Sequence, residues 1–299
     1  MTMRTNVIPD LGSWQGEAPL HHYFVCDVFT ANPLEGNQLG VFTDGRALTA
    51  EEMQRLAREL NFAETVFLLP PARDGDVHVR IFTPTAELPF AGHPVLGTAF
   101  VVGEALGGDS VALETGAGVI AVRLEREDNR IVFGWMAQPI PKVETYEHER
   151  ELLAALGLSH SRLPVECYRN GPPHVFVALE SENAVAAVAP DMSVLSELAV
   201  AVNCFAGAGR SWKTRMFFPA AGVPEDPATG SAAGPLALHL ARHGSIAFGA
   251  EIEVTQGVEI GRPSRLYARV EGSDDAVTAV EVGGVAVIVA EGHYRISAG

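Results

Sequence analysis

The segment TPTAELPFAGHPVLGT, from Thr83 to Thr98, ends a loop and begins an apolar run with helical spacing. Pro94 suits a first helical turn, because the N–H that it lacks would be unbonded there anyway. We therefore predict a helix over 94–106 with Gly92 and His93 at its N-terminus. Free N–H groups and the helix dipole favour an anion at such a position, so a carboxylate could bind there. His93 could also be an ordinary polar cap without chemistry.

The second half of the chain repeats this arrangement. Strand, Phe-x-Pro, loop, small residues and helix follow one another in TRMFFPAAGVPEDPATGSAAGPLALHLARHG (214–244). Gly230 and Ser231 take the places of Gly92 and His93, and NGPPHVFVAL (170–179) echoes GNQLGVF (36–42). This weak internal match, at a period of about 135 residues, predicts two similar lobes. Each lobe would present a glycine-led helix N-terminus, and the two would face each other across a cleft.

Helical and strand patterns alternate in the first half, which favours an α/β fold. Apolar alternation predicts strands over 22–30, 36–42, 64–69 and 77–84. The segment LTAEEMQRLAREL (48–60) predicts a helix that begins with a capping box of Thr49 and Glu52 and ends at Asn61.

Glu64 stands where that helix gives way to the strand ETVFLL. Alternation places it on the face of Val66 and Leu68, so it lies either at the wet end of the strand or in apolar surroundings that raise its pKa. Asp226, just before the second glycine-led helix, is by itself most simply a helix cap. With His93, the two carboxylates form a candidate acid–base group. GRPS (261–264) could be a turn or a strap that closes the cleft.

Composition limits the possible functions. The chain has 299 residues, of which 47% are hydrophobic and 19% charged, as expected for one large or two ordinary globular domains. A net charge of −16 argues against binding to nucleic acid or to anionic membranes. No apolar run approaches the roughly 20 residues of a membrane span. The N-terminus lacks the apolar core of a signal peptide, and we interpret residues 1–20 as a flexible extension.

The cysteines and histidines give no sign of a cofactor. Cys26, Cys167 and Cys204 are odd in number and far apart, which indicates reduced thiols in a cytoplasm. Among the ten histidines we find no spacing that we interpret as a ligand set. We therefore predict no metal site.

Six motifs cover nearly everything after residue 20: YFVCDVFTANPLEGNQLGVF, NFAETVF, FTPTAELPFAGHP, NGPPHVFVAL, NCFAGAGRSWKTRMFFPAAGVPEDPATGSAAGPLALHLARHG and QGVEIGRPS. Together they resemble the PhzF-type family, the phenazine-biosynthesis isomerases that act on trans-2,3-dihydro-3-hydroxyanthranilate. The resemblance implies the diaminopimelate-epimerase-like fold, in which each of two pseudo-symmetric lobes is a curled sheet around a central helix. Lobe 1 would comprise 21–135, completed by a strand at about 285–299, and lobe 2 would comprise 136–284. The resemblance also implies a homodimer.

Matched residue by residue, the resemblance makes Glu64, His93 and Asp226 the catalytic residues. It gives Gly92, Gly230 and Ser231 the task of holding the substrate. The family often has a serine before the glutamate, and Ala63 here removes a hydroxyl near the ligand.

The implied reaction is a proton transfer without a cofactor, in which Glu64 takes a proton from C3 of the ring and returns one at C1. Three alternatives stay open. The protein could be an amino-acid racemase or epimerase on the same fold, although the cysteine pair of the related racemases is missing here. It could act on a different small cyclic acid, or bind such an acid without turning it over.

Overall fold

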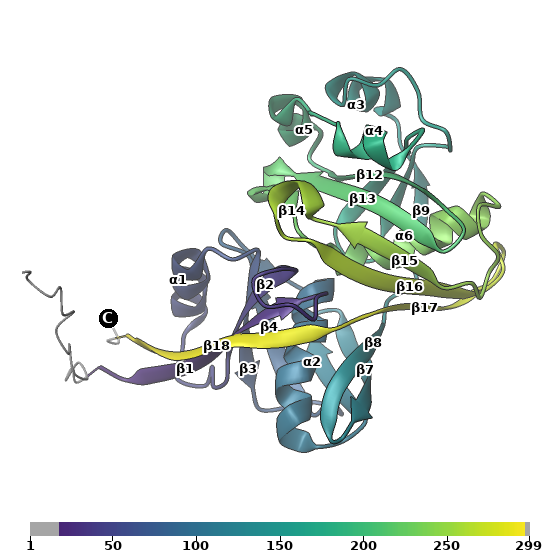
Figure 1. Cartoon of the computed structure of the whole chain (residues 1–299). Coiled ribbons are helices and arrows are strands. Elements are labelled where there is room, and N and C mark those ends of the chain that lie inside the picture. Colours follow the sequence, from purple (N-terminus) through teal and green to yellow (C-terminus); the bar gives the residue numbers. More distant parts are fainter. Residues whose placement is uncertain (1–17, 297–299) are drawn as a thin grey trace, which may run out of the picture.

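The computed structural model describes residues 18–296, and it shows two lobes that each surround one long helix with strands (Figure 1). Part of the predicted N-terminal extension, residues 1–17, lies outside the described residues. The first lobe contains β1 (Leu20–Val28), β2 (Asn37–Phe42), α1 (Ala50–Leu60), β3 (Glu64–Leu69), β4 (Val77–Phe82), β5 (Glu87–Leu88), α2 (Gly92–Leu106), β6 (Ser110–Thr115), β7 (Gly118–Glu127) and β8 (Arg130–Ala137).

The chain then builds the second lobe and returns to the first. The second lobe contains β9 (Lys142–Thr145), α3 (Glu149–Ala155), β10 (Glu166–Arg169), β11 (Pro173–Ala178), α4 (Glu182–Ala186), α5 (Met192–Leu198), β12 (Ala201–Ala208), β13 (Ser211–Phe218), the 3₁₀ turn η1 (Pro219–Ala221), β14 (Val223–Asp226), α6 (Gly230–Arg242), β15 (Ile252–Gln256), the 3₁₀ turn η2 (Val258–Ile260), β16 (Ser264–Gly272) and β17 (Val277–Gly284). The last strand, β18 (Ala286–Arg295), pairs antiparallel with β1 in the first lobe.

Strand pairing follows the same pattern in both lobes. In the first, β2 and β3 are parallel, as are β4 and β6. In the second, the parallel pairs are β11 with β12 and β13 with β15. The short strands β5 and β14 each pair antiparallel with the preceding long strand and lead into the central helix. The internal repeat seen in the sequence is therefore a repeat of topology, and the α/β fold class is confirmed.

The predicted helix boundaries hold where local chemistry sets them. In α1, the Thr49 side chain accepts from the Glu52 N–H while the Glu52 carboxylate accepts from the Thr49 N–H. Asn61 ends the helix in a left-handed conformation, and Met53 and Leu56 are buried on its inner face. This capping box satisfies backbone donors that a helix start otherwise leaves unbonded.

The central helix α2 begins two residues earlier than predicted. Its N-cap is Ala91, whose side chain makes no capping hydrogen bond. His93 therefore lies inside the first turn, and the interpretation of His93 as the polar cap is wrong. The helix is apolar on every side, as expected for a helix enclosed by its own sheet, and Val95, Leu96 and Ala99 are fully buried.

Three of the predicted strands have different ends, and the second begins at Asn37 instead of Gly36. The first strand spans 20–28 instead of 22–30 because Phe29 takes a left-handed backbone conformation with φ of 65°. The strand predicted over 77–84 stops at Phe82, where the chain turns toward β5.

A half-buried arginine ties the second lobe to the first. Arg262, within the GRPS motif, donates to Asp27 Oδ1 at 2.6 Å, to the Glu35 carbonyl at 2.7 Å and to the Gly36 carbonyl at 2.9 Å. The Gly36 N–H in turn donates to the Pro263 carbonyl at 3.1 Å. This segment is therefore a strap between the lobes, one of the two alternatives that the sequence left open.

The three cysteines are free and buried. Within residues 18–296, none of the helices combines the length and the apolar character that a membrane span requires.

Candidate active site

One pocket between the lobes brings together all six residues singled out in the sequence. Its first-lobe wall includes Glu64, Gly92 and His93. Its second-lobe wall includes Asp226, Gly230 and Ser231. Ala63, which precedes Glu64 in the first lobe, also lines the pocket. Four apolar side chains, those of Leu88, Met216, Phe218 and Val223, surround these polar groups.

The two central helices meet at their N-termini beside this pocket. A Cβ atom added to Gly92 would lie 2.5 Å from the Ser231 nitrogen and 2.6 Å from the Gly230 carbonyl carbon. Only glycine allows such a close backbone approach, which explains the residue that precedes His93. Because both helix dipoles direct positive charge to this point, an anion there is stabilised from two sides.

Glu64 and His93 face each other without forming a hydrogen bond. Their Oε2 and Nε2 atoms are 3.3 Å apart, and neither atom has a hydrogen-bond partner among the described residues. His93 is 4% exposed and Glu64 is 14% exposed. Buried polar atoms in native proteins nearly always have partners, so a bound ligand is expected to complete this pair.

Asp226 is held by a network that crosses between the lobes. The Asn37 side-chain amide, at the start of β2, donates to Asp226 Oδ1 at 2.8 Å and to the Ala228 carbonyl at 2.9 Å. The same nitrogen lies 3.2 Å from His93 Nδ1. The Thr229 hydroxyl donates to Asp226 Oδ2 at 2.6 Å. Asp226 lies on β14 and accepts from Thr229 instead of capping α6, so the interpretation of Asp226 as a helix cap is wrong.

The carboxyl groups of Glu64 and Asp226 both have pKa values above the ordinary ones. Burial and then the charge of Asp226 raise the pKa of Glu64 to about 8. Burial raises the pKa of Asp226 to about 6, against hydrogen bonds from Thr229 and Asn37 that lower it. Near neutral pH the pair therefore shares close to one proton, held mainly by Glu64. Burial lowers the pKa of His93 to about 3, so its imidazole is neutral.

Ser231 has a partner that the sequence analysis did not single out. Its Oγ lies 3.0 Å from His174 Nε2, and His174 is fully buried on β11. Asn37 and His174 were missed as site residues, although both stand in quoted motifs. The signal that could have found them is the internal repeat, which places the two side chains at the start of equivalent strands.

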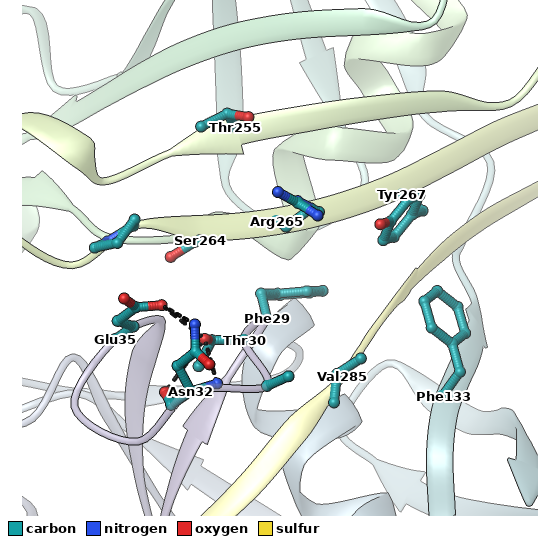
Figure 2. Close-up of a pocket in the computed structure, with 12 residues that line it drawn as sticks. Phe29, Thr30, Asn32, Glu35, Phe133, Thr255, Ser264, Arg265, Tyr267 and Val285 are labelled. Atoms are coloured by element: carbon teal, nitrogen blue, oxygen red, sulfur yellow. Dashed lines mark hydrogen bonds between the residues drawn. The ribbon is translucent and has the colours of Figure 1, made fainter. Parts of the chain in front are cut away.

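A larger groove between the lobes holds no comparable acid–base pair. Its volume is about 290 Å³, against about 90 Å³ for the pocket above. Figure 2 shows Arg265 and Tyr267 of β16 on one side of it and Asn32 and Phe133 on the other. Its lining carboxylate, Glu35, is bonded to the Asn32 amide at 2.9 Å. We therefore place the chemistry in the smaller pocket.

The prediction that no histidines form a ligand-like set is wrong. His239 in the last turn of α6 and His243, its C-cap residue, converge on Glu166 Oε2 at 3.4 and 2.9 Å. Arg242 also contacts this oxygen at 3.1 Å and supplies the positive charge that a cation would bring. We interpret the cluster as an ion-pair network at the C-terminal end of α6, remote from the pocket residues at its N-terminus.

The fold and the pocket define a class: two-lobed α/β proteins that enclose acid–base groups between two facing helix N-termini. A hydroxyproline epimerase from Agrobacterium vitis has this fold, with a TM-score of 0.64 over 93% of each chain and 11% identity. Within the class, the chain belongs to the phenazine biosynthesis-like protein family, whose sequence profile matches residues 26–292.

Two relatives support this assignment. A phenazine biosynthesis protein of the PhzF family from Bacillus anthracis superimposes with a TM-score of 0.82 and 26% identity, covering 93% of this chain and 100% of that one. A trans-2,3-dihydro-3-hydroxyanthranilate isomerase from Pseudomonas aeruginosa is 56% identical over 275 residues, which are 92% of this chain and 99% of that protein. The family prediction is confirmed.

Proposed function

We propose that this protein is an isomerase that converts trans-2,3-dihydro-3-hydroxyanthranilate to the aminoketone precursor of phenazines. The observation that carries the proposal is the buried Glu64 carboxyl, 3.3 Å from His93 in a pocket that both lobes line. The 56% identical relative, named for this activity, supports the choice of substrate.

Glu64 acts as the base and then as the acid. In its ionised form Glu64 takes the proton from C3 of the ring, the diene electrons shift, and Glu64 returns a proton at C1. The resulting enol then relaxes to the ketone. A carboxyl whose pKa lies near the working pH suits such a relay, and a positioned acid–base group contributes about 10²–10⁴-fold to the rate. Burial of the site strengthens the electrostatic stabilisation that must supply the remainder.

The other groups hold the substrate. His93 and Asp226 orient its amino and hydroxyl groups and stabilise the shifting charge. The first turns of α2 and α6, at Gly92 and Gly230, and the Ser231 hydroxyl receive its carboxylate, where two helix dipoles favour negative charge.

The same resemblance supports proposals about the assembly of the protein, its location and the boundaries of its lobes. We propose that the catalytic unit is a homodimer in the cytoplasm. Each chain would have one lobe of 21–135 completed by about 285–299, of which 297–299 lie outside the described residues, and a second lobe of 136–284, with the substrate between them. Gel filtration at several protein concentrations tests the dimer.

Incubation with the dihydro-hydroxyanthranilate, followed by mass spectrometry, tests the proposed activity. We expect a tricyclic condensation product that does not form without the protein. An epimerised amino acid without tricycle would indicate a racemase. Binding without turnover would indicate a binding protein, or an enzyme specific for another cyclic acid.

We propose that this chemistry needs no cofactor, because proton transfer by carboxyl and imidazole groups requires none. Prolonged dialysis against a chelator should leave turnover within about twofold of the untreated enzyme. Loss of activity that one divalent ion restores would contradict the mechanism.

A further inference from the structure

The Ser231 hydroxyl lies between a buried imidazole and the pocket. Ser231 and His174 both line the pocket, and the Ser231 Oγ lies 3.0 Å from His174 Nε2. In this contact either group could donate, because a neutral imidazole has one N–H and one bare nitrogen and a hydroxyl both donates and accepts. The direction of the hydrogen bond depends on which ring nitrogen carries the proton.

The contacts of the Asn203 side chain indicate which ring nitrogen of His174 carries the proton. Its side-chain nitrogen lies 3.1 Å from the Ala201 carbonyl and 3.4 Å from the Val175 carbonyl. Carbonyl oxygens only accept, so the amide group that faces them is the NH₂ group and not its oxygen. The same nitrogen lies 3.5 Å from His174 Nδ1. A donor opposite Nδ1 requires a bare Nδ1, and the ring proton is then on Nε2.

We infer that His174 is a positioning residue that donates from Nε2 to Ser231 Oγ and so leaves the Ser231 hydroxyl proton to be donated into the pocket. Because burial lowers the pKa of His174 to about 3, the ring keeps this single N–H across the working pH range. Resting on the proposed function, this arrangement makes Ser231 a dedicated donor to the substrate's carboxylate. It is the opposite polarity to a hydrolase, in which the imidazole takes the serine proton.

The tautomer can be measured on the protein alone. With ¹⁵N-labelled histidine, NMR of the wild-type protein should show His174 protonated at Nε2 and unprotonated at Nδ1. The Ser231→Ala variant assigns the resonance through the change at Nε2. A proton on Nδ1 would overturn the inference whatever reaction the enzyme performs.

Variants test the consequence for the ligand. His174→Phe removes the donor and keeps a planar ring, whereas His174→Gln keeps an N–H near the position of Nε2. We expect His174→Phe to raise KM about 10- to 100-fold with kcat changed less than about threefold, because the Ser231 hydroxyl is no longer held with its proton toward the substrate's carboxylate. His174→Gln should recover most of the loss. His21→Phe, at a buried histidine outside the pocket lining, is the matched control and should leave KM unchanged.

Two further comparisons separate positioning from a general effect on the fold. In the Ser231→Ala background, His174→Phe should add little to KM, because the group that it positions is already absent. Binding of the planar analogue 2-amino-3-hydroxybenzoate should weaken in His174→Phe, while binding of its neutral amide should not. Additive losses, or equal weakening of both ligands, would show a structural role only. These binding measurements need no turnover, so a failure of the proposed reaction is seen separately.

Discussion

The two lobes share one topology but place different chemistry at equivalent positions. Glu64 pairs with Leu39 across the parallel strands β2 and β3, and Asn203 pairs with Phe176 across β11 and β12. Leu39 stands two residues after Asn37, and Phe176 stands two residues after His174. Strand register therefore makes Glu64 equivalent to Asn203, and Asn37 equivalent to His174.

The same register compares the short strands before the central helices. Leu88 pairs with Ile81 in the first lobe, and Asp226 pairs with Met216 in the second. At the position equivalent to each carboxylate, the other lobe therefore has a residue that cannot ionise. Asn203 is the equivalent of Glu64, and Leu88 is the equivalent of Asp226. A two-base racemase needs bases on both faces of its substrate, whereas in the mechanism proposed above the only base, Glu64, comes from the first lobe.

The largest expected effect comes from replacing the proposed base, Glu64, by an amide like that of Asn203 at the equivalent position. Glu64→Gln puts an amide in both lobes and keeps shape while losing the ability to take a proton. Turnover should fall by at least about 10²-fold, measured as kcat with folding checked by circular dichroism. Glu59→Gln, an exposed carboxylate on α1, is the control and should retain full activity. Activity of Glu64→Gln within a few-fold of wild type would remove Glu64 from the mechanism.

A second prediction concerns the strap that holds the two lobes in register. Arg262→Met leaves Asp27, which is 1% exposed, buried without its cation. Loss of one partner of such a pair costs about 3–5 kcal/mol in the free energy of unfolding, measurable by urea denaturation. The exposed pair of Arg46 and Asp44 provides the matched control, and Arg46→Met should cost less than about 1 kcal/mol. Equal costs would show that the Arg262–Asp27 pair stabilises the fold no more than an exposed ion pair does.

The sequence could predict the elements whose signals are local. The capping box at Thr49 and the left-handed Asn61 depend on neighbours within one turn, so both ends of α1 were predictable. Glu64, His93 and Asp226 were found through the family motifs and the repeat, and the structure brings them into one pocket.

What could not be predicted depends on contacts distant in sequence. Asn37 and Asp226 are 189 residues apart, and nothing near either residue indicates their hydrogen bond. The early start of α2 follows from the close contact between Gly92 and Gly230, which only the folded pair of lobes creates. His239 and His243 have a recognisable spacing, but their partner Glu166 comes from another element.

A third prediction tests whether one lobe supplies the only base. Substrate deuterated at C3 and turned over in ordinary water should deliver part of its deuterium to C1, because a single enclosed carboxylate removes and returns it. The labelled substrate should also react more slowly if proton abstraction limits the rate. Complete loss of the label to solvent would contradict a shielded relay through Glu64, although Glu64 could still be the base.

The smallest expected effect is on stability, and it depends on pH. The pKa of Glu64 rises from 4.5 to about 8 on folding, so the folded state holds a proton that the unfolded state releases. Its contribution to stability is complete below pH 4.5 and is lost as the pH rises through about 8. Glu64→Gln cannot ionise and escapes this loss. We expect its Tm to match wild type near pH 5 and to exceed it by roughly 2–5 °C at pH 9, as measured by calorimetry.

A carboxylate of the same lobe supplies the control of opposite sign. Burial opposes ionisation of Glu114, but backbone N–H groups of Ala72, Gly75 and Arg73 donate to it and bring its pKa below the ordinary value. The folded state thus favours the charged form, whose contribution is present above the unfolded pKa and lost in acid. Glu114→Gln should therefore lower Tm most at high pH, where Glu64→Gln raises it. If both variants shifted Tm in the same direction at pH 9, ionisation of Glu64 would not destabilise the folded state. The assignment of Glu64 as the base with a raised pKa would then fail.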